Sequence, residues 1–479
     1  MLFNSIDFAI FLPIVFILYW FVTNKSLKLQ NLLIVIASYI FYGWWDWRFL
    51  SLIIFSTFVD YSIGIALSKQ ENNFKRKILL WTSIIVNLGF LGFFKYYNFF
   101  LYNFKTAFSF FGSEISANSL NIILPVGISF YTFQTLSYSI DVYKRRIEPT
   151  KDIIAFSAFV SFFPQLVAGP IERATNLLPQ FYKERKFEYA LAVNGMRQIL
   201  WGLFKKVVIA DNCAQYANLI FNNSSEQSGS TLLLGAIFFT FQIYGDFSGY
   251  SDIAIGTSRL FGFNLMQNFA FPYFSRDIAE FWRRWHISLS TWFRDYLYIP
   301  LGGSRGSTWL KVRNVFIIFL VSGFWHGANW TFIIWGGLNA LYFLPILLTK
   351  NNRKNLDTVA EGRYLPRIKE LLLMLLTFGL TVFAWIFFRA ESVTHAIRYI
   401  SEIFSGSLLS IPKIRPTYVF ILIIIFLIFE WLGRNLQYPL QNIQYRCPIL
   451  IRYLLYISLA TAILLFSGGK EQQFIYFQF

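Results

Sequence analysis

The chain has 479 residues, of which 56% are hydrophobic, 21% are aromatic and only 14% are charged, and its formal net charge is +17. Soluble domains carry about 25% charged residues, and the mean hydropathy of +0.49 also lies on the apolar side. This composition excludes a soluble globular protein. The positive charge does not indicate nucleic-acid binding here, because Lys and Arg collect in the cytoplasmic loops of membrane proteins.

Long apolar blocks recur from one end of the chain to the other, and a membrane-spanning helix needs about 20 mostly apolar residues. The blocks are Phe8–Val22, Phe49–Leu67, Ile78–Phe94, Leu120–Ile140, Leu232–Ile243, Trp330–Leu348, Leu371–Phe388, Tyr418–Ile428 and Tyr453–Phe466. With weaker segments included, we expect roughly 10–12 spans in an all-α polytopic membrane protein. The first block is predicted to be a span and not a signal peptide, because it lacks a basic start and a small-residue cleavage site.

The charge of the connecting segments predicts their side of the membrane. Ser68–Lys77 holds four basic residues and one acidic, Tyr102–Asn118 holds one of each, and Lys144–Asp152 holds four basic and two acidic. Because basic residues favour the cytoplasmic side, Ser68–Lys77 is predicted inside, and Tyr102–Asn118 and the N-terminus outside. The longest polar interval, Lys350–Glu370, has six basic and three acidic residues and is predicted to be a cytoplasmic loop.

The middle of the chain differs from its ends, because from Phe241 to Trp330 the apolar runs are short and interrupted by charge. Irregular backbone or charged side chains at membrane depth are tolerated only where protein covers them or where they line an aqueous cavity. We therefore interpret residues 241–330 as the catalytic middle of one membrane-embedded domain, 1–479, with 1–140 and 371–479 as flanking scaffold helices. Within this middle, Asp277–Phe293 is predicted to be one short helix that lies at the interface or dips into the membrane and returns.

Any histidine-dependent chemistry must use one of three histidines: His286, His326 and His395. His326 lies in the string Trp325–Trp330, directly before an apolar span, and Asn329 in the same string can donate to a developing oxyanion or orient an acceptor. An intramembrane histidine is a functional candidate, and the alternative is a histidine that is hydrogen-bonded between helices. Both interpretations stay open for His286, and His395 is interpreted as a loop residue.

Other chemistries fit poorly. The chain has no GxSxG elbow, no HExxH motif, no Walker loop and no GxGxxG after a strand. Cys213 and Cys447 lie far apart and outside any CxxC pattern, and no histidine follows another at metal-ligand spacing, so we expect neither a metal site nor a disulfide. Both cysteines are interpreted as buried apolar fillers.

A basic cluster of net charge +4 occupies the second half of the middle. Its members are Arg276, Asp277, Glu280, Arg283, Arg284, Arg294, Asp295, Arg305, Lys311 and Arg313. One interpretation is ordinary anchoring on the cytoplasmic side. The other is a seat for the phosphates of an acyl donor, because guanidinium groups match phosphate oxygens. The donor-binding candidates are Arg283, Arg284, Arg294 and Arg305.

Three strings of the middle resemble the membrane-bound O-acyltransferase superfamily. They are Gln242–Gly256 (with Asp246, Ser248 and Asp252), Phe281–Gly303 and Trp325–Trp330. Within the superfamily the chain resembles most the bacterial alginate O-acetyltransferase branch, to which Met1–Ser5 and the closing Phe474–Phe479 are also similar. The resemblance therefore covers essentially the whole chain.

The resemblance implies a helical bundle of the cell membrane with re-entrant or interfacial helices around a central tunnel, and it assigns the catalytic histidine to His326 and a supporting one to His286. It implies a cytoplasmic acyl thioester as co-substrate, acetyl-CoA in this branch, with no covalently bound cofactor. The acetyl group would pass outward to a periplasmic or extracellular partner of the SGNH-hydrolase type that decorates a polysaccharide. Membrane lipids are the other expected partner, and nucleic acid is not.

The expected chemistry is acetyl transfer from a thioester to a hydroxyl group, which needs a base and protection of the donor from water. A histidine at a constriction lined by Phe324, Trp325 and Trp330 offers both, so His326 is predicted to be the general base. The alternative within the superfamily is a D-alanyl transferase for teichoic acids, whose donor is a carrier-protein thioester. The alternative from another class is a transporter or flippase whose charged middle lines a solute path.

Overall fold

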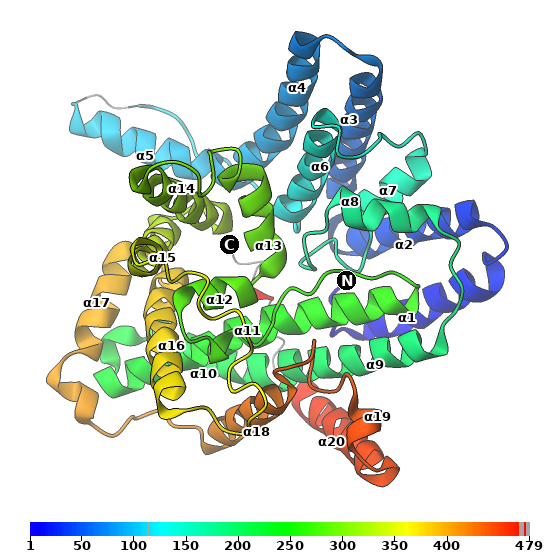
Figure 1. Cartoon of the computed structure of the whole chain (residues 1–479). Helices are drawn as coiled ribbons and strands as arrows, with labels where there is room; N and C mark the ends of the chain where they lie inside the picture. Colours follow the sequence, from blue (N-terminus) through cyan, green and yellow to red (C-terminus); the bar gives the residue numbers. More distant parts are fainter. Residues whose placement is uncertain (113–114, 469–473, 476–479) are drawn as a thin grey trace. The chain divides into compact units, whose positions relative to one another are not determined.

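The computed structural model describes residues 1–112, 115–468 and 474–475, and every regular element in these residues is a helix (Figure 1). Seven segments are long and apolar enough to cross a membrane: Leu27–Lys69, Asn73–Phe110, Gly229–Leu260, Thr308–His326, Trp330–Leu348, Ile368–Arg389 and Ile449–Ser467. Two shorter apolar helices are Ile6–Val22 and Thr417–Gly433. The helical polytopic fold is thus confirmed, and the total of roughly 10–12 spans stays a prediction.

The chain divides into two compact units, residues 1–192 with 257–265 and residues 193–256 with 266–479. The helices that begin in the first unit are α1 (Ile6–Ile17), α2 (Leu27–Asp46), α3 (Leu50–Lys69), α4 (Asn73–Leu91), α5 (Tyr97–Phe110), α6 (Ile128–Tyr143), α7 (Ile153–Ser161), α8 (Ala174–Leu177) and α9 (Tyr189–Leu203). Helix α5 covers part of the predicted outer loop Tyr102–Asn118, of which residues 113–114 lie outside the described residues.

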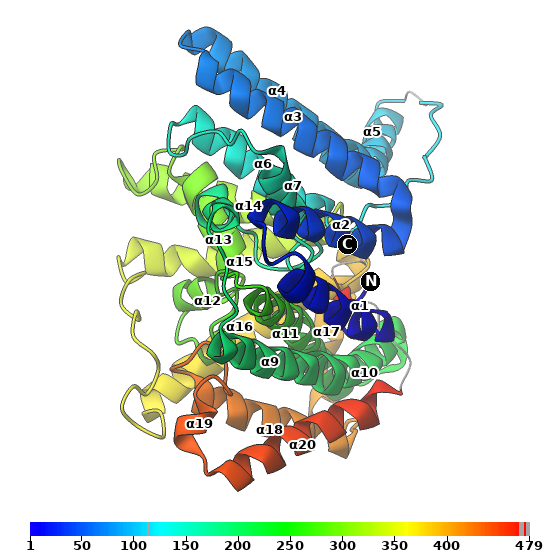
Figure 2. The ribbon, with the colours of Figure 1, turned by 90° about the vertical axis from the view of Figure 1, so that its right-hand side faces the viewer.

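A buried carboxylate holds three helices of the first unit together. Helices α3 and α4 form an antiparallel hairpin (Figure 2), and α6 packs against both. Asp60 of α3 accepts hydrogen bonds from Ser83 (2.5 Å) and Asn87 (2.8 Å) of α4 and from Ser139 (2.7 Å) of α6. These polar partners satisfy a carboxylate that interrupts an otherwise apolar span. Asp60 therefore has a structural role in the helix packing.

The second unit contains the predicted catalytic middle, 241–330, except residues 257–265. Its helices are α10 (Asp211–Asn222), α11 (Gly229–Leu260), α12 (Ile278–Arg284), α13 (Ile287–Phe293), α14 (Thr308–His326), α15 (Trp330–Leu348), α16 (Ile368–Arg389), α17 (Val393–Ile403), α18 (Thr417–Gly433), α19 (Ile443–Arg446) and α20 (Ile449–Ser467). Two π-helical turns, Phe204–Ala210 and Arg294–Tyr298, follow α9 and α13. Helices α9 and α11 contribute their first and last residues, respectively, to the first unit.

The prediction of one helix over Asp277–Phe293 is wrong, because the structure breaks it into α12 and α13. Asp277 caps α12 through a 2.7 Å bond from the amide of Glu280, and Trp285 leaves the helix with an extended backbone. His286 then adopts a left-handed conformation with φ of 44° and ψ of 55°. That conformation is costly for a residue with a side chain, and such residues cluster at functional sites.

Helices α14 and α15 form a tightly packed hairpin that positions the end of α14. A Cβ atom added at Gly323 of α14 would overlap the carbonyl oxygen of Phe332, and one added at Gly336 of α15 would overlap that of Phe319. The two backbones approach so closely only because both crossing residues are glycines. His326, the last residue of α14, is therefore held against α15.

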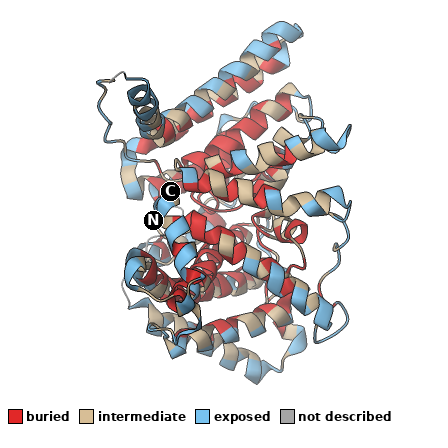
Figure 3. Cartoon of the chain, turned by 90° about the vertical axis from the view of Figure 1, so that its left-hand side faces the viewer, coloured by how far each residue is buried: buried red, intermediate tan, exposed pale blue. Residues whose placement is uncertain are grey.

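Large apolar side chains cover much of the outer surface. Figure 3 shows exposed residues along the outer faces of the helices and buried ones on their inner faces. Helix α20 buries only Leu459, and its exposed residues include Leu464 (73%) and Leu465 (75%). In an integral membrane protein such a surface faces lipid, which accounts for the apolar blocks that the sequence repeats.

Candidate active site

His326 lies in an aromatic pocket built by three helices. Its side chain is buried, with 5% exposure, at the end of α14. Its ring centroid lies 5.1 Å from that of Trp335 on α15 and 5.2 Å from that of Phe388 on α16, both in edge contacts. Trp325, its neighbour in the chain, lies at 4.9 Å. These rings exclude water from the imidazole, as transfer from a reactive thioester requires.

His286 is also buried, and a polar chain fixes its ring. Its Nδ1 atom lies 3.0 Å from Oδ1 of Asn268, which also accepts a 2.9 Å bond from Ser288, while Nδ2 of Asn268 donates to Ser251 over 3.0 Å. An amide oxygen only accepts, so Nδ1 carries the proton and Nε2 holds the lone pair of the neutral ring. The tautomer and the orientation of His286 are thus set by Asn268.

The indole of Trp325 brings the two histidines together. Its ring centroid lies 6.2 Å from that of His286 and 4.9 Å from that of His326. Both histidine positions that the sequence selected therefore belong to one buried site. His395 does not, because it lies in the first turn of α17, where its ring is 3.1 Å from the hydroxyl of Ser224. Its interpretation as a loop residue is wrong, although it stays outside the site.

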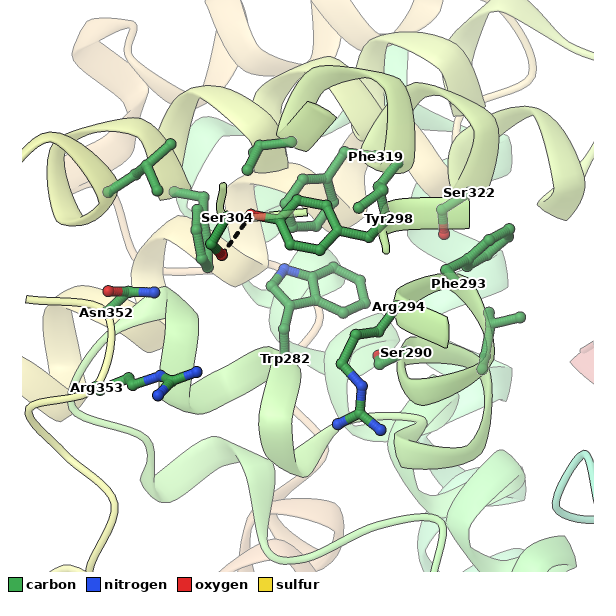
Figure 4. Close-up of a pocket in the computed structure, with 15 residues that line it drawn as sticks. Trp282, Ser290, Phe293, Arg294, Tyr298, Ser304, Phe319, Ser322, Asn352 and Arg353 are labelled. Carbon is green, nitrogen blue, oxygen red and sulfur yellow. Dashed lines mark hydrogen bonds between the residues drawn. The ribbon is translucent and has the colours of Figure 1, made fainter. Parts of the chain in front are cut away.

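A cavity of about 270 Å³ lies against helices α12 to α15 (Figure 4). Its lining comes from α12 to α15, the π-helical turn Arg294–Tyr298, the segment 299–307 and the loop 349–367 between α15 and α16. The lining residues are Trp282, Leu289, Ser290, Phe293, Arg294, Tyr298, Ser304, Val315, Ile318, Phe319, Ser322, Phe343, Leu347, Asn352 and Arg353. Ser322 precedes His326 by one helical turn on the same face of α14, about 6 Å along the axis. The cavity therefore extends to the turn of α14 next to His326.

The predicted donor-binding arginines separate into two groups. Arg283 donates to the carbonyl groups of Asn352 (2.8 Å) and Asn355 (2.7 Å), and Arg284 pairs with Glu280 (2.9 Å), so both hold protein groups. Arg294 lines the cavity and also pairs with Asp295 (2.7 Å). Arg305 is exposed in the turn before α14. Of the four candidates, only Arg294 borders the cavity.

Asn329 and Trp330 occupy structural positions. Oδ1 of Asn329 accepts a bond from the amide of Thr331 (3.1 Å), which caps α15, and Nδ2 donates to the carbonyl of Glu391 (2.9 Å). The side chain of Trp330 is 52% exposed, so it does not wall in the buried histidine. Of the three residues predicted to position the acceptor, only Trp325 contacts both imidazoles. The oxyanion role of Asn329 stays a prediction.

Asp246, Ser248 and Asp252 of α11 form a buried ionic network with two lysines that the sequence analysis missed. Nζ of Lys206 lies 2.7 Å from Asp246, and Nζ of Lys205 lies 2.5 Å from Asp252 and 2.9 Å from Ser248. The sequence does contain a signal for this network: two adjacent lysines in an apolar segment need anionic partners. These motif residues therefore anchor the π-helical turn Phe204–Ala210 to α11.

The closing motif Phe474–Phe479 also reaches this network. The amide of Ile475 donates to Asp246 over 2.7 Å, and the ring of Phe474 lies 4.9 Å from that of Tyr250. Residues 476–479 lie outside the described residues. The described part of the motif is thus buried against α11.

The chain is thus a polytopic helical membrane protein, and its buried histidine pair is the candidate for a water-excluded reaction site. Residues 79–385 match the model of the MBOAT, membrane-bound O-acyltransferase, family, and the chain belongs to that family. It is therefore an O-acyltransferase, and the transporter or flippase alternative is set aside.

Relatives with known names extend the match over most of the chain. The chain is 39% identical to the probable alginate O-acetylase AlgI of Pseudomonas aeruginosa, over 94% of this chain and 84% of that protein. It is 37% identical to the peptidoglycan O-acetyltransferase of Helicobacter pylori, over 83% of this chain and 79% of that protein. It is 28% identical to the teichoic acid D-alanyltransferase of Bacillus subtilis, over 57% of this chain and 71% of that protein.

Proposed function

We propose that this enzyme moves an acetyl group from cytoplasmic acetyl-CoA across the cell membrane for the O-acetylation of an exported or cell-wall polysaccharide. The names of the relatives from Pseudomonas aeruginosa and Helicobacter pylori support an acetyl group and an envelope polymer. The acceptor of the acetyl group is a hydroxyl group, on a periplasmic or extracellular partner of the SGNH-hydrolase type that passes it to the polymer.

One observation supports the proposal: a cavity with two arginines and several aromatic rings in its lining reaches the turn of α14 that precedes His326. Arg294 and Arg353 line one side of it, and Ser322, next to His326, lies on the opposite side (Figure 4). The loop 349–367, which supplies Arg353, is predicted to be cytoplasmic from its charge. A donor with an anionic head therefore finds its head group at the rim and its thioester near the histidine.

His326 acts as the general base in this scheme. Its imidazole accepts the hydroxyl proton as the oxygen attacks the thioester carbonyl, the carbon–sulfur bond breaks, and the proton passes to the leaving thiolate. The rings of Trp325, Trp335 and Phe388 keep water from competing with the hydroxyl group. His286, whose ring Asn268 orients, supports the site next to Trp325.

The test uses purified enzyme in proteoliposomes with acetyl-CoA labelled in the acetyl group. We expect cleavage of the thioester that depends on an added hydroxyl acceptor, and a loss of about 10²–10⁴-fold in His326→Ala, the usual contribution of general-base catalysis. Size-exclusion chromatography and thermal unfolding show whether the variant still folds. Transfer at the wild-type rate by a folded His326→Ala variant would remove His326 from the mechanism.

The relative from Bacillus subtilis supports one alternative, a D-alanyl transfer to teichoic acid. In that reaction the donor is a carrier-protein thioester. The same assay with labelled D-alanyl carrier protein in place of acetyl-CoA separates the two. Turnover with the carrier and none with acetyl-CoA would support the alternative and reject the acetyl donor.

A further inference from the structure

We propose that Arg353, together with Arg294, binds the phosphates of a coenzyme A thioester, and that Arg283 positions Arg353 for this contact. This inference rests on the proposed function and identifies how its donor is recognised. The sequence analysis did not select Arg353, which lies in a polar loop with no catalytic motif.

The backbone on either side of Arg353 is fixed. Arg283 of α12 donates to the carbonyl groups of Asn352 (2.8 Å) and Asn355 (2.7 Å), so one guanidinium group spans the segment that contains Arg353. The side-chain amide of Asn355 also donates, through Nδ2, to the carboxylate of Asp277 over 2.6 Å. A bidentate guanidinium holds its partners in a defined geometry, so the position of Arg353 at the rim is set by α12.

The rest of the loop is held in the same way. Arg276 pairs with Asp357 at 3.0 Å, and Arg434 of α18 donates to the carbonyl groups of Val359 (3.0 Å) and Ala360 (3.0 Å). Val359 and Ala360 are buried. The loop is therefore a fixed part of the cavity wall.

Arg353 differs from these arginines in its partners. Protein carbonyl and carboxylate groups accept hydrogen bonds from Arg276, Arg283 and Arg434. Arg353, in contrast, is exposed and makes no hydrogen bond or ion pair within the described part of the chain. Arg353 and Arg294 both line the cavity, and so does Trp282 (Figure 4). Two guanidinium groups around one opening favour an anion, and phosphates match their geometry.

The size and the polarity of the cavity select the rest of the ligand. At about 270 Å³ it is smaller than most pockets for whole nucleotides, and rings such as Phe293, Phe319 and Phe343 line its interior. Ser304 and Asn352 add polar groups to the lining. A slender pantetheine arm that ends in a thioester fits the interior, while the phosphates of the nucleotide stay at the basic rim.

The experiment compares two donors that share the thioester and the pantetheine arm and differ in the phosphorylated adenosine nucleotide. Acetyl-CoA carries phosphates, whereas acetyl-pantetheine has the same thioester and arm without them. For Arg353→Gln we expect KM for acetyl-CoA to rise about tenfold or more, as for loss of a charge-assisted hydrogen bond, with kcat unchanged. KM for acetyl-pantetheine is expected to stay at the wild-type value. Arg353→Lys keeps the positive charge but not the forked guanidinium group. Its KM for acetyl-CoA should lie between those of the wild type and Arg353→Gln.

Lys354→Gln is the matched control, because it removes the same charge from the adjacent exposed residue, which does not line the cavity. We expect its KM for acetyl-CoA to be that of the wild type. Arg283→Gln should raise KM for acetyl-CoA, and the double variant Arg283→Gln/Arg353→Gln should be no worse than Arg353→Gln alone, because Arg283 acts through Arg353.

The outcomes separate this inference from the proposed function. If the wild-type enzyme cleaves acetyl-CoA and Arg353→Gln leaves its KM unchanged, or changes both donors equally, the role of Arg353 is rejected and the proposed function stands. If the wild-type enzyme does not cleave acetyl-CoA, both are rejected. If the effects of Arg283→Gln and Arg353→Gln on KM for acetyl-CoA add fully in the double variant, only the positioning role of Arg283 is rejected.

Discussion

Asn268 accepts a 3.0 Å hydrogen bond from Nδ1 of His286 and so decides which nitrogen of that ring carries the proton. His286 itself sits in a left-handed backbone conformation at the break between α12 and α13. We expect Asn268→Ala to lower acetyl transfer about tenfold or more, the scale of losing a group that orients a functional histidine. Initial rates with labelled acetyl-CoA measure this. A variant that folds normally and keeps the full rate would show that the orientation of His286 does not limit transfer.

His286→Asn is expected to lose less activity than His326→Ala, because His286 supports the site while His326 exchanges the proton. The asparagine at position 286 keeps a polar side chain that can hydrogen-bond to Asn268, but it cannot act as a base. The two variants are compared for kcat in the same proteoliposome assay. If His286→Asn proves the more damaging of the two, the roles of the histidines must be exchanged.

The crossing of α14 and α15 predicts a steric effect. Gly323→Ala would place a Cβ atom against the carbonyl oxygen of Phe332, and overpacking of this kind costs about 1–3 kcal/mol. Gly337→Ala in α15 is the control, because its Cβ atom would lie 3.8 Å from the nearest side-chain atom of Leu320. We expect a lower unfolding temperature for the first variant and no shift for the second. Equal shifts would mean that the close crossing is not what stabilises this hairpin.

The buried lysines predict a stability effect without a catalytic one. Nζ of Lys206 lies 2.7 Å from Asp246 and 2.8 Å from Asp211, so Lys206→Met leaves buried negative charge without its partner. Breaking such a pair costs about 3–5 kcal/mol. Thermal unfolding in detergent measures the loss, and Lys206→Met/Asp246→Asn should recover part of it because the second change removes one charge. A double variant as unstable as the single one would contradict a charge-based cause.

The attachment of the loop 349–367 is predicted to be insensitive to pH over the physiological range. Hydrogen bonds from Arg276 lower the pKa of Asp357 below the 3.8 of a free aspartate. A lowered carboxyl pKa contributes stability above the unfolded value, which is lost only as pH falls through the folded value. We expect hydrogen exchange of residues 352–358 to show constant protection, after correction for intrinsic rates, between about pH 5.5 and 8. Asp357→Asn should lose protection at pH 7, and loss in the wild type within that range would refute this explanation.

The sequence by itself determined the class of molecule and limited the candidate residues for its chemistry. Blocks such as Leu371–Phe388 can be stable only in lipid, so their composition fixes a polytopic helical fold without reference to any partner. The scarcity of histidine limited the candidates to three, and the strings around His286 and His326 singled out the two that share the site. Periodicity failed at Asp277–Phe293, because a helical pattern does not reveal a residue held in the left-handed region by tertiary contacts.

Only the tertiary structure decided which polar groups meet, because the pairing of segments far apart in the chain depends on how helices pack. It brought Trp325 near both imidazoles, paired Lys205 with Asp252, and assigned Arg283 to the loop 349–367. Composition gives every arginine of a basic cluster the same meaning. The contacts show that Arg283 and Arg284 hold protein groups, whereas Arg294 of the cluster and Arg353 of the loop 349–367 border the cavity.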